Sequence, residues 1–191
     1  MTEELVDVYA PDGSKTGEIL TKEQAIKEGK LIKAFQIWIL NNKNEVLMQL
    51  RSAEKIHDAG MIDICGGHVQ SQEREIDAVV REMKEELGEN VFSPDELKKI
   101  QKVGNGRVDF TKYGRQGNYI IPWYVLRIQR SIDYEDFDLQ KEEIAKVKWI
   151  PYQDVKNAII SGKKNIRIPN TQTVVNLISK LEEKMYEEER E

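Results

Sequence analysis

The stretch that most limits the fold of this chain runs from Cys65 to Glu89 and reads CGGHVQSQEREIDAVVREMKEELGE. Its second half predicts an amphipathic helix over residues 73–87, because apolar side chains recur there at helical spacing and Gly88 follows as a stop signal. Ahead of the helix, Gly66 and Gly67 predict a turn in which the backbone can approach a neighbour closely. The apolar positions are Ile76, Val79, Val80, Met83 and Leu87.

The same helix gathers carboxylates on one side. Glu82, Glu85 and Glu86 lie at positions i, i+3 and i+4 and therefore share a helical face. Two carboxylates about 6 Å apart repel by roughly 3 kcal/mol at an effective dielectric constant of about 20, so a bridging cation would stabilise such a face. Oxygen ligands alone select a hard ion such as Mg²⁺ or Mn²⁺. The alternative is a solvated face on which the glutamates pair with Arg81 and Lys84.

The long-range spacing favours metal binding over the solvated face. Gly67 is followed after five residues by Glu73, and after seven more by REMKEELG, residues 81–88. This pattern resembles the box of the Nudix family, a loop, a helix and a loop that here span Gly67 to Glu89. One position departs from the family pattern, because Glu89 stands where an apolar residue is usual.

The resemblance implies roles for the residues of the box. The three glutamates would bind a divalent metal, Mg²⁺ or alternatively Mn²⁺, with help from the carbonyl of Gly67. Arg81 would orient Glu82 and Glu73 through charge-assisted hydrogen bonds. A metal between helix carboxylates and a diphosphate can polarise the phosphorus atom and deprotonate a bound water, so the implied roles agree with the chemistry of the side chains.

The rest of the chain alternates between strand and helix patterns. An N-terminal hairpin is expected around the turn PDGS, followed by a helix over 21–29 with Thr21 as N-cap, Gln24 as capping-box partner and Gly29 at the exit. Pro122 argues for an edge strand or a bulge in YIIPWYVLRI. The other expected strands are AFQIWIL and EVLMQL in the middle of the sheet, and IAKVKWI; the other expected helices are SPDELKKI, YQDVKNAIISG and TQTVVNLISKLEEKM.

Several apolar side chains of these elements are expected in the core. The last helix should bury Val174, Ile178, Leu181 and Met185. Trp38, Trp123 and Trp149 lie in expected strands and are assigned to the core as well.

Strands mixed with helices predict an α/β fold. The resemblance implies a Nudix-type α/β/α sandwich with a mixed β-sheet, an N-terminal β-hairpin extension and a closing C-terminal helix. Residues 1–30 would form a hairpin and short helix packed on the core, and residues 31–191 the Nudix domain, within a single structural unit. The length of 191 residues can bury such a core without a metal or disulfide staple.

Composition excludes several classes of protein. The net charge of −5 argues against a broad nucleic-acid-binding surface, and no helix-turn-helix segment is recognisable. One cysteine excludes an internal disulfide and a cysteine-rich zinc site, as is typical of a reducing compartment. The N-terminal segment is too polar for a signal peptide, and no apolar run reaches the roughly 20 residues of a membrane helix. We therefore expect a soluble cytoplasmic protein.

The segments flanking the box resemble a Nudix branch that includes isopentenyl-diphosphate isomerase. That enzyme needs a cysteine directly before the Gly-His of its box, where this chain has Gly66, with Cys65 one residue too early. Its additional histidine ligands are missing, and Gly117 and Tyr119 occupy the positions of its later acids. The resemblance therefore implies a hydrolase rather than an isomerase, with Cys65 as a small buried residue.

Further candidate site residues lie outside the box. For the charged ones, the alternative to a functional role is an ordinary solvated charge at the surface. Glu143, with Glu142, precedes an expected strand where the family often has its water-activating base. Arg51 and Lys55 resemble basic positions that grip a diphosphate in the isomerase-like branch. His68 is a candidate phosphate contact or a residue bonded within the turn. His57 is expected in an exposed loop, and GKKNIR (162–167) is a candidate basic patch. The glycine-rich stretch 104–118 is expected to be a mobile loop, and Tyr113 or Tyr119 near it is a candidate stacking platform.

These features favour a metal-dependent hydrolase that cleaves the diphosphate linkage of a nucleoside-diphosphate-linked or related phosphorylated small molecule. The alternatives are an isopentenyl-diphosphate isomerase-like enzyme and a non-catalytic nucleotide-binding module. The substrate's leaving group is not specified by the sequence, since recognition of that group belongs to loops. The N-terminal hairpin is a candidate surface for a homodimer.

Overall fold

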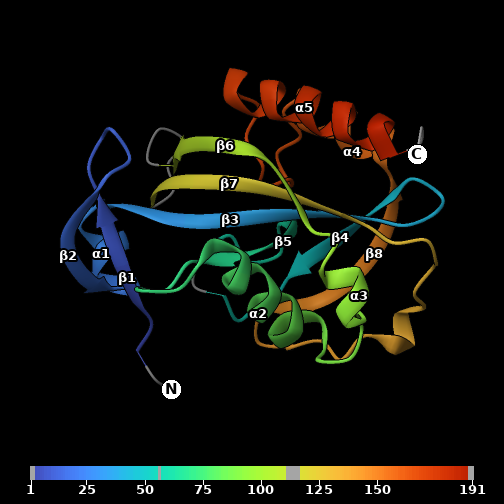
Figure 1. Ribbon diagram of the computed structural model, residues 1–191, viewed down its shortest axis with the longest axis horizontal. Helices are drawn as coiled ribbons and strands as arrows, with labels where there is room; N and C mark the ends of the chain where they lie inside the picture. The colour runs from blue at the N-terminus through green and yellow to red at the C-terminus, as the bar shows by residue number, and fades with distance from the viewer. Residues whose placement is uncertain (1–2, 56, 111–116, 189–191) are drawn as a thin grey trace.

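The computed structural model describes residues 3–55, 57–110 and 117–188 (Figure 1). Its described strands form one mixed sheet in the order β2-β1-β3-β5-β4-β8, with β7 added beside β3 and β6 beside β7. The strands are β1 Leu5–Tyr9, β2 Lys15–Thr21, β3 Leu31–Leu40, β4 Glu45–Arg51, β5 Ile62–His68, β6 Gln101–Asp109, β7 Asn118–Arg127 and β8 Ile144–Pro151. The helices are α1 Lys22–Lys27, α2 Glu75–Leu87, α3 Pro94–Leu97, the 3-10 turn η2 Tyr134–Asp136, α4 Tyr152–Ile160 and α5 Gln172–Glu188.

Strand β3 is the centre of the sheet. On one side it pairs antiparallel with β1 at Leu31, with β5 along residues 34–37, and with β4 at Leu40. On the other side it runs parallel to β7. Strand β5 therefore enters between β3 and β4, which touch only near the turn that joins them, and this places the box next to the central strand.

Helices cover both faces of the sheet, with α5 on one side and α2 on the other (Figure 1). The side chains of β3 alternate between the two cores: Phe35 and Ile37 join the cluster under α2, whereas Trp38 and Leu40 join the cluster under α4 and α5. A strand buried on both faces reads as a continuous apolar run, which explains the sequence AFQIWIL. The expected α/β/α sandwich with a mixed sheet is confirmed.

Helix α2 follows its expected pattern closely. It begins at Glu75, two residues later than expected, and Gly88 ends it with φ of 119°. Met83 and Leu87 are 0% and 1% exposed, and burial of a side chain of this size stabilises the fold by about 1.5–3 kcal/mol. After the helix, Glu89 is exposed and pairs with Lys84 (2.6 Å), while Val91 is buried. Val91 thus fills the apolar role that Glu89 cannot.

The predicted turn at Gly66 and Gly67 is wrong, because both glycines belong to β5. A Cβ on Gly66 would lie 2.5 Å from the carbonyl oxygen of Phe35. These glycines therefore permit close approach inside a sheet rather than a reversal of the chain.

A second expectation that fails concerns the glycine-rich segment after α3. Residues 101–109 form strand β6, not a loop. A Cβ on Gly106 would lie 2.9 Å from a methyl carbon of Leu177, so glycine lets α5 pack closely on β6. Tyr113 and its neighbours at 111–116 lie outside the described residues.

The expectation of an edge strand at Pro122 is also wrong, since β7 lies between β3 and β6. The register shift sits in the partner strand β6, between Lys102 and Gly104. The pairs with β3 pass from Ile120 directly to Trp123, skipping the proline, which has no N–H to donate.

Most of the remaining expectations are confirmed. The N-terminal hairpin forms, and Thr21 Oγ1 accepts from the Gln24 amide (3.2 Å), although the Gln24 side chain donates to Glu28 instead of returning to the cap. Trp149 is only half-buried. The stripe of α5, Val174, Ile178, Leu181 and Met185, is buried, as are Trp38 and Trp123. In the described ranges, no helix combines the length and apolarity that crossing a bilayer requires.

Candidate active site

The guanidinium of Arg81 is the centre of the acidic cluster on α2. Its Nε and Nη2 donate to the two carboxylate oxygens of Glu73 at 2.9 and 3.0 Å, and its Nη1 donates to Glu82 at 3.0 Å and to Glu85 at 3.1 Å. Nη2 also donates to the carbonyl of His68 at the end of β5 (3.2 Å). One side chain therefore ties the loop before α2, the helix face and the end of β5 into a fixed arrangement.

Strand β5 passes close to α2 at Gly67. A Cβ on Gly67 would lie 2.3 Å from Glu82 Cδ and 2.5 Å from Glu82 Oε1. The Gly67 backbone therefore lies beside the Glu82 carboxylate. Burial raises the pKa of Glu82 to about 7, although the charge of Arg81 acts in the opposite direction.

Glu86 is the most enclosed carboxylate of the box. Its residue is 6% exposed, and its Oε2 lies 3.8 Å from Cys65 Sγ. Burial raises the pKa of Glu86 well above its ordinary value, and the negative charges of Glu82 and Glu143 act in the same direction. A carboxylate taken out of water without a cation beside it is costly, so this position suits a bound positive ion.

The donor set fits a hard divalent cation, because it consists of carboxylate oxygens and the Gly67 backbone. The three glutamates are nevertheless not gathered around one point. Within the described ranges, no three acidic, histidine or cysteine side chains meet in a ready metal cluster. The Glu85 carboxylate is 53% exposed and turned to Arg81, whereas Glu86 is enclosed.

A second group of charges surrounds the end of β4. Lys55 pairs with Glu143, and the Ser52 amide donates to the Glu143 carbonyl at 2.9 Å. Arg51 Nη2 donates to the His57 carbonyl (3.1 Å), while its Nε is enclosed without a hydrogen-bond partner in the described part of the chain. The charges of this group reach the Glu86 carboxylate: Glu143 raises its pKa, and Lys55 and Arg51 lower it. The predicted base and the predicted cations therefore lie at the same site as the box.

His68 lies between the two groups. Its Nε2 is enclosed and has no hydrogen-bond partner among the described residues. Burial lowers the pKa of His68 to about 3, and the nearby positive charges of Lys22, Arg167, Lys55 and Arg51 act in the same direction. A neutral imidazole thus lies near four basic side chains.

One of those four cations, Lys22, was not singled out from the sequence, and Arg167 was named only as part of a candidate basic patch. Lys22 begins α1, pairs with Glu4, and acts electrostatically on His68. Arg167 donates to Asp58 and Asp63 (2.7 and 3.1 Å). Arg167 belongs to the candidate basic patch 162–167, but Lys22 carries no local sequence signal, because its position depends on how the N-terminal extension folds back.

Four further residues singled out from the sequence lie either in the core or at the surface. Tyr119 is 4% exposed, and its ring packs on His68 and Phe110 with centroid distances of 5.7 and 5.8 Å, so it is not an open stacking platform. Cys65 is buried, as expected. His57 and Glu142 are exposed.

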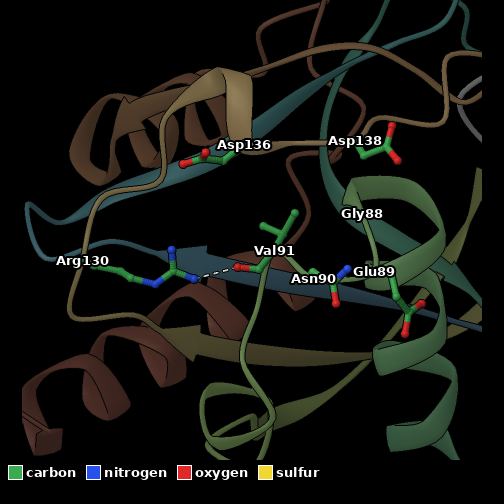
Figure 2. A pocket seen from close by; sticks show the side chains of 7 residues that line it. All are labelled: Gly88, Glu89, Asn90, Val91, Arg130, Asp136 and Asp138. Carbon is green, nitrogen blue, oxygen red and sulfur yellow. Dashed lines mark hydrogen bonds between the residues drawn. The ribbon is translucent and has the colours of Figure 1, made fainter.

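A separate hollow lies beyond the last turn of α2, and Figure 2 shows its lining. Arg130 crosses it to donate to the Val91 carbonyl at 2.6 Å and to Glu96 at 2.8 Å. Its lining includes none of the candidate site residues. The residues are Gly88, Glu89, Asn90, Val91, Arg130, Asp136 and Asp138.

Comparisons with known proteins agree with this geometry. A family model described as NUDIX domain matches residues 30–167. Nudix hydrolase 3 of Arabidopsis thaliana is 32% identical over 160 residues, which are 82% of this chain and 20% of that protein. Isopentenyl-diphosphate Delta-isomerase of Pectobacterium atrosepticum is 29% identical over 82 residues, 42% of this chain and 46% of that protein. The chain thus spans less than half the length of either relative.

Solved structures share the fold. The crystal structure of DR0079 from Deinococcus radiodurans has a TM-score of 0.59 and 19% identity, covering 83% of this chain and 90% of that one. The NUDIX domain of Shewanella oneidensis NrtR, solved in complex with ADP ribose, has a TM-score of 0.53 and 16% identity, covering 87% of this chain and 99% of that one.

Proposed function

The chain belongs to the Nudix family, and we propose that it is a hydrolase that cleaves a diphosphate linkage in a nucleoside-diphosphate-linked or related phosphorylated small molecule. The main support for the proposal is the cluster that Arg81 forms with Glu73, Glu82 and Glu85, called the Arg81 cluster here. That cluster holds Glu73 and Glu82 in fixed positions while Gly67 brings β5 against Glu82. Such an arrangement prepares oxygen ligands before any substrate arrives, which is how catalytic sites lower a barrier.

We assign the cation to Glu82, Glu85, Glu86 and the carbonyl of Gly67, with Mg²⁺ as the physiological ion and Mn²⁺ as a substitute. When bound, a divalent cation offsets the charge of a diphosphate and lowers the pKa of a coordinated water. Arg81 positions Glu82 and Glu85 for this role through the bonds described above. The enclosed Glu86 carboxylate supports the assignment, because the cation would relieve the cost of its burial.

The substrate's phosphate groups are assigned to the cations near His68. Lys22, Arg51, Lys55 and Arg167 would neutralise them. His68 would stay neutral and would orient one oxygen only if substrate binding opens its enclosed Nε2. Charges on several different elements can grip a diphosphate from more than one side.

Glu143 is the proposed base that takes a proton from the attacking water. In the free protein it is paired with Lys55. A phosphate that draws Lys55 away would leave Glu143 free to accept the proton, so the base would become active only when substrate is present. The pairing with Lys55 would thus keep Glu143 from acting as a base until a substrate is bound.

The isomerase-like alternative is supported by the isomerase relatives. It is weakened because this chain has Gly66 where the isomerase needs a cysteine. A cysteine at that position would bring its Cβ within 2.5 Å of the Phe35 carbonyl oxygen. We therefore rank isomerisation second. Incubation with isopentenyl diphosphate in heavy water tests it directly, and deuterium in the recovered substrate would revive it.

A panel assay tests the proposed function. ADP-ribose, nucleotide sugars, dinucleoside polyphosphates, coenzymes and nucleoside triphosphates would be incubated with Mg²⁺ and the intact chain, with Glu86→Gln as the matched inactive control. We expect hydrolysis of at least one class by the wild type only. Equal turnover by both proteins would show that the assigned residues are not the catalytic site. The predicted cytoplasmic location and a homodimer through the N-terminal hairpin are further proposals, which fractionation and light scattering can test.

A further inference from the structure

The N-terminal hairpin of β1 and β2 lies outside residues 30–167, which the family model matches. It nevertheless contacts the 69–73 loop of the box, which joins β5 to α2. The Ser71 amide donates to the Leu5 carbonyl at 2.8 Å, and the Ser71 hydroxyl donates to Asp7 Oδ1 at 3.1 Å. Strand β1 therefore supplies both backbone and side-chain acceptors to this loop.

Asp7 is placed to hold the loop in a conformation that it would not prefer alone. Gln72 has φ of 66°, in the left-handed region that residues with side chains rarely adopt. The Gln72 backbone lies near enough to the Asp7 carboxylate to contribute to the lowered pKa of Asp7. Lys15 of β2 donates to the other Asp7 oxygen at 2.6 Å. The carboxylate is thus held by Lys15 from the hairpin side and hydrogen-bonded to Ser71 of the loop, next to Gln72.

The loop in turn fixes Glu73. The Gln70 amide donates to Glu73 Oε2 at 3.0 Å, and the Glu73 amide donates to the Gln70 carbonyl at 3.1 Å. Glu73 then receives two bonds from Arg81, which also holds Glu82. A continuous series of contacts therefore runs from Asp7 through the loop to the carboxylates of α2.

A second contact of β1 reaches the start of α2. Lys33 of β3 lies over the Tyr9 ring at 4.8 Å from its centroid and donates to Glu75 at 2.8 Å. Asp7 of β1 therefore contacts the loop through Ser71, and Tyr9 of β1 contacts the first residue of α2 through Lys33.

From these contacts we infer that Asp7 is a positioning residue for the Nudix site, acting through the 69–73 loop and Glu73 on Arg81. The inference rests on the proposed function for its kinetic consequence, but not for its structural one. The hairpin is then a working part of the site rather than an appendage, since mutation of residues that orient a metal's ligands typically costs about 10–100-fold in metal affinity or activity.

Three proteins test the inference: Asp7→Ala, Asp7→Asn and the hairpin control Glu18→Gln, which removes a pair with Lys30 without touching the loop. Hydrogen exchange of peptides covering 69–73 and Mn²⁺ titration by electron paramagnetic resonance are the readouts. Asp7→Ala should raise loop exchange and weaken Mn²⁺ binding by about 10-fold. Asn keeps an acceptor oxygen for the Ser71 hydroxyl, so Asp7→Asn should recover part of both. Glu18→Gln should match the wild type.

On a substrate found in the panel, Asp7→Ala should lower kcat by about 10-fold and change KM by less than about twofold, because the phosphate-binding cations are untouched. If exchange and Mn²⁺ affinity of Asp7→Ala match those of Glu18→Gln, the inference is wrong. If the wild type binds no Mn²⁺ while Asp7→Ala still frees the loop, the proposed function fails and the loop anchor stands. Should Asp7→Ala not fold, as judged by circular dichroism, Ser71→Ala takes its place under the same criteria.

Discussion

Gly67 and Glu82 approach each other so closely that a Cβ on Gly67 would lie 2.3 Å from Glu82 Cδ. The contact joins the end of β5 to the carboxylate face of α2. Any side chain at position 67 must displace either the strand or the carboxylate, and both belong to the proposed cation site. The requirement for glycine is thus a requirement for space, since Gly67 does not have a positive φ.

Gly67→Ala is expected to lose most activity while the protein still folds. The inserted methyl group should cost about 1–3 kcal/mol of unfolding free energy, as overpacking usually does. Activity should fall much further, by about 100-fold, because Glu82 is moved away from its position beside the backbone. Steady-state kinetics and urea unfolding of the same sample measure the two effects. A variant with full activity would show that Glu82 does not need this position.

Arg81→Lys should fail to replace arginine, although the positive charge is kept. A lysine ammonium cannot make the forked contact with Glu73 and also reach Glu82 and Glu85. We expect kcat to fall by about 100-fold with a smaller change in thermal stability. Activity of Arg81→Lys within about twofold of the wild type would show that charge alone suffices. Arg74→Lys is a suitable control, because Arg74 pairs only with the exposed Asp77 among its described ion pairs.

Lys22→Met and Lys55→Met should weaken substrate binding rather than abolish turnover. Each removes one of the cations near His68, so KM should rise by about 10-fold per substitution, and the dependence of KM on salt should become shallower. Lys156→Met, which breaks a pair with Glu182 between α4 and α5, is the matched control. Unchanged KM in both variants would place the phosphates elsewhere.

Stability should fall in acid partly through Glu75. Burial acts against ionisation, but hydrogen bonds from Lys102, Lys33 and Tyr124 prevail and lower the pKa of Glu75 from 4.5 to about 2. The folded state therefore favours the ionised form. Its contribution, roughly 1–3 kcal/mol, is present above pH 4.5 and disappears as the pH falls toward 2.

Denaturant unfolding of the wild type and of Glu75→Gln between pH 7 and pH 3 measures this contribution. The difference in unfolding free energy between the two proteins should shrink as the pH falls. A difference that stays constant over that range would mean that Glu75 does not titrate as described.

Local patterns were sufficient to predict α2, its end at Gly88 and most of its buried face, with a start two residues too early. The helix depends on residues close together in the sequence, and Met83 and Leu87 occupy the core as their spacing requires. The box glutamates and Arg81 could be identified for the same reason, since their spacing lies within one helix and its preceding loop.

Features that depend on distant contacts were missed. Gly66 was predicted in a turn and Gly106 in a mobile stretch, yet each lies in a strand against a group remote in sequence, the Phe35 carbonyl and the Leu177 side chain. The role of Lys22 depends on the fold of the N-terminal extension, and that of Arg167 on its pairing with Asp63. Propensity describes the residue and its neighbours, so it cannot show which surface will be packed against a glycine.

Anomalous diffraction from a crystal soaked in Mn²⁺ and a non-hydrolysable diphosphate analogue would locate the cation directly. We predict an Mn²⁺ peak bounded by Glu82, Glu85, Glu86 and the carbonyl of Gly67, with the diphosphate reaching toward Lys55. A well-ordered diphosphate with no anomalous peak at these oxygens, or a peak at a different part of the molecule, would contradict it.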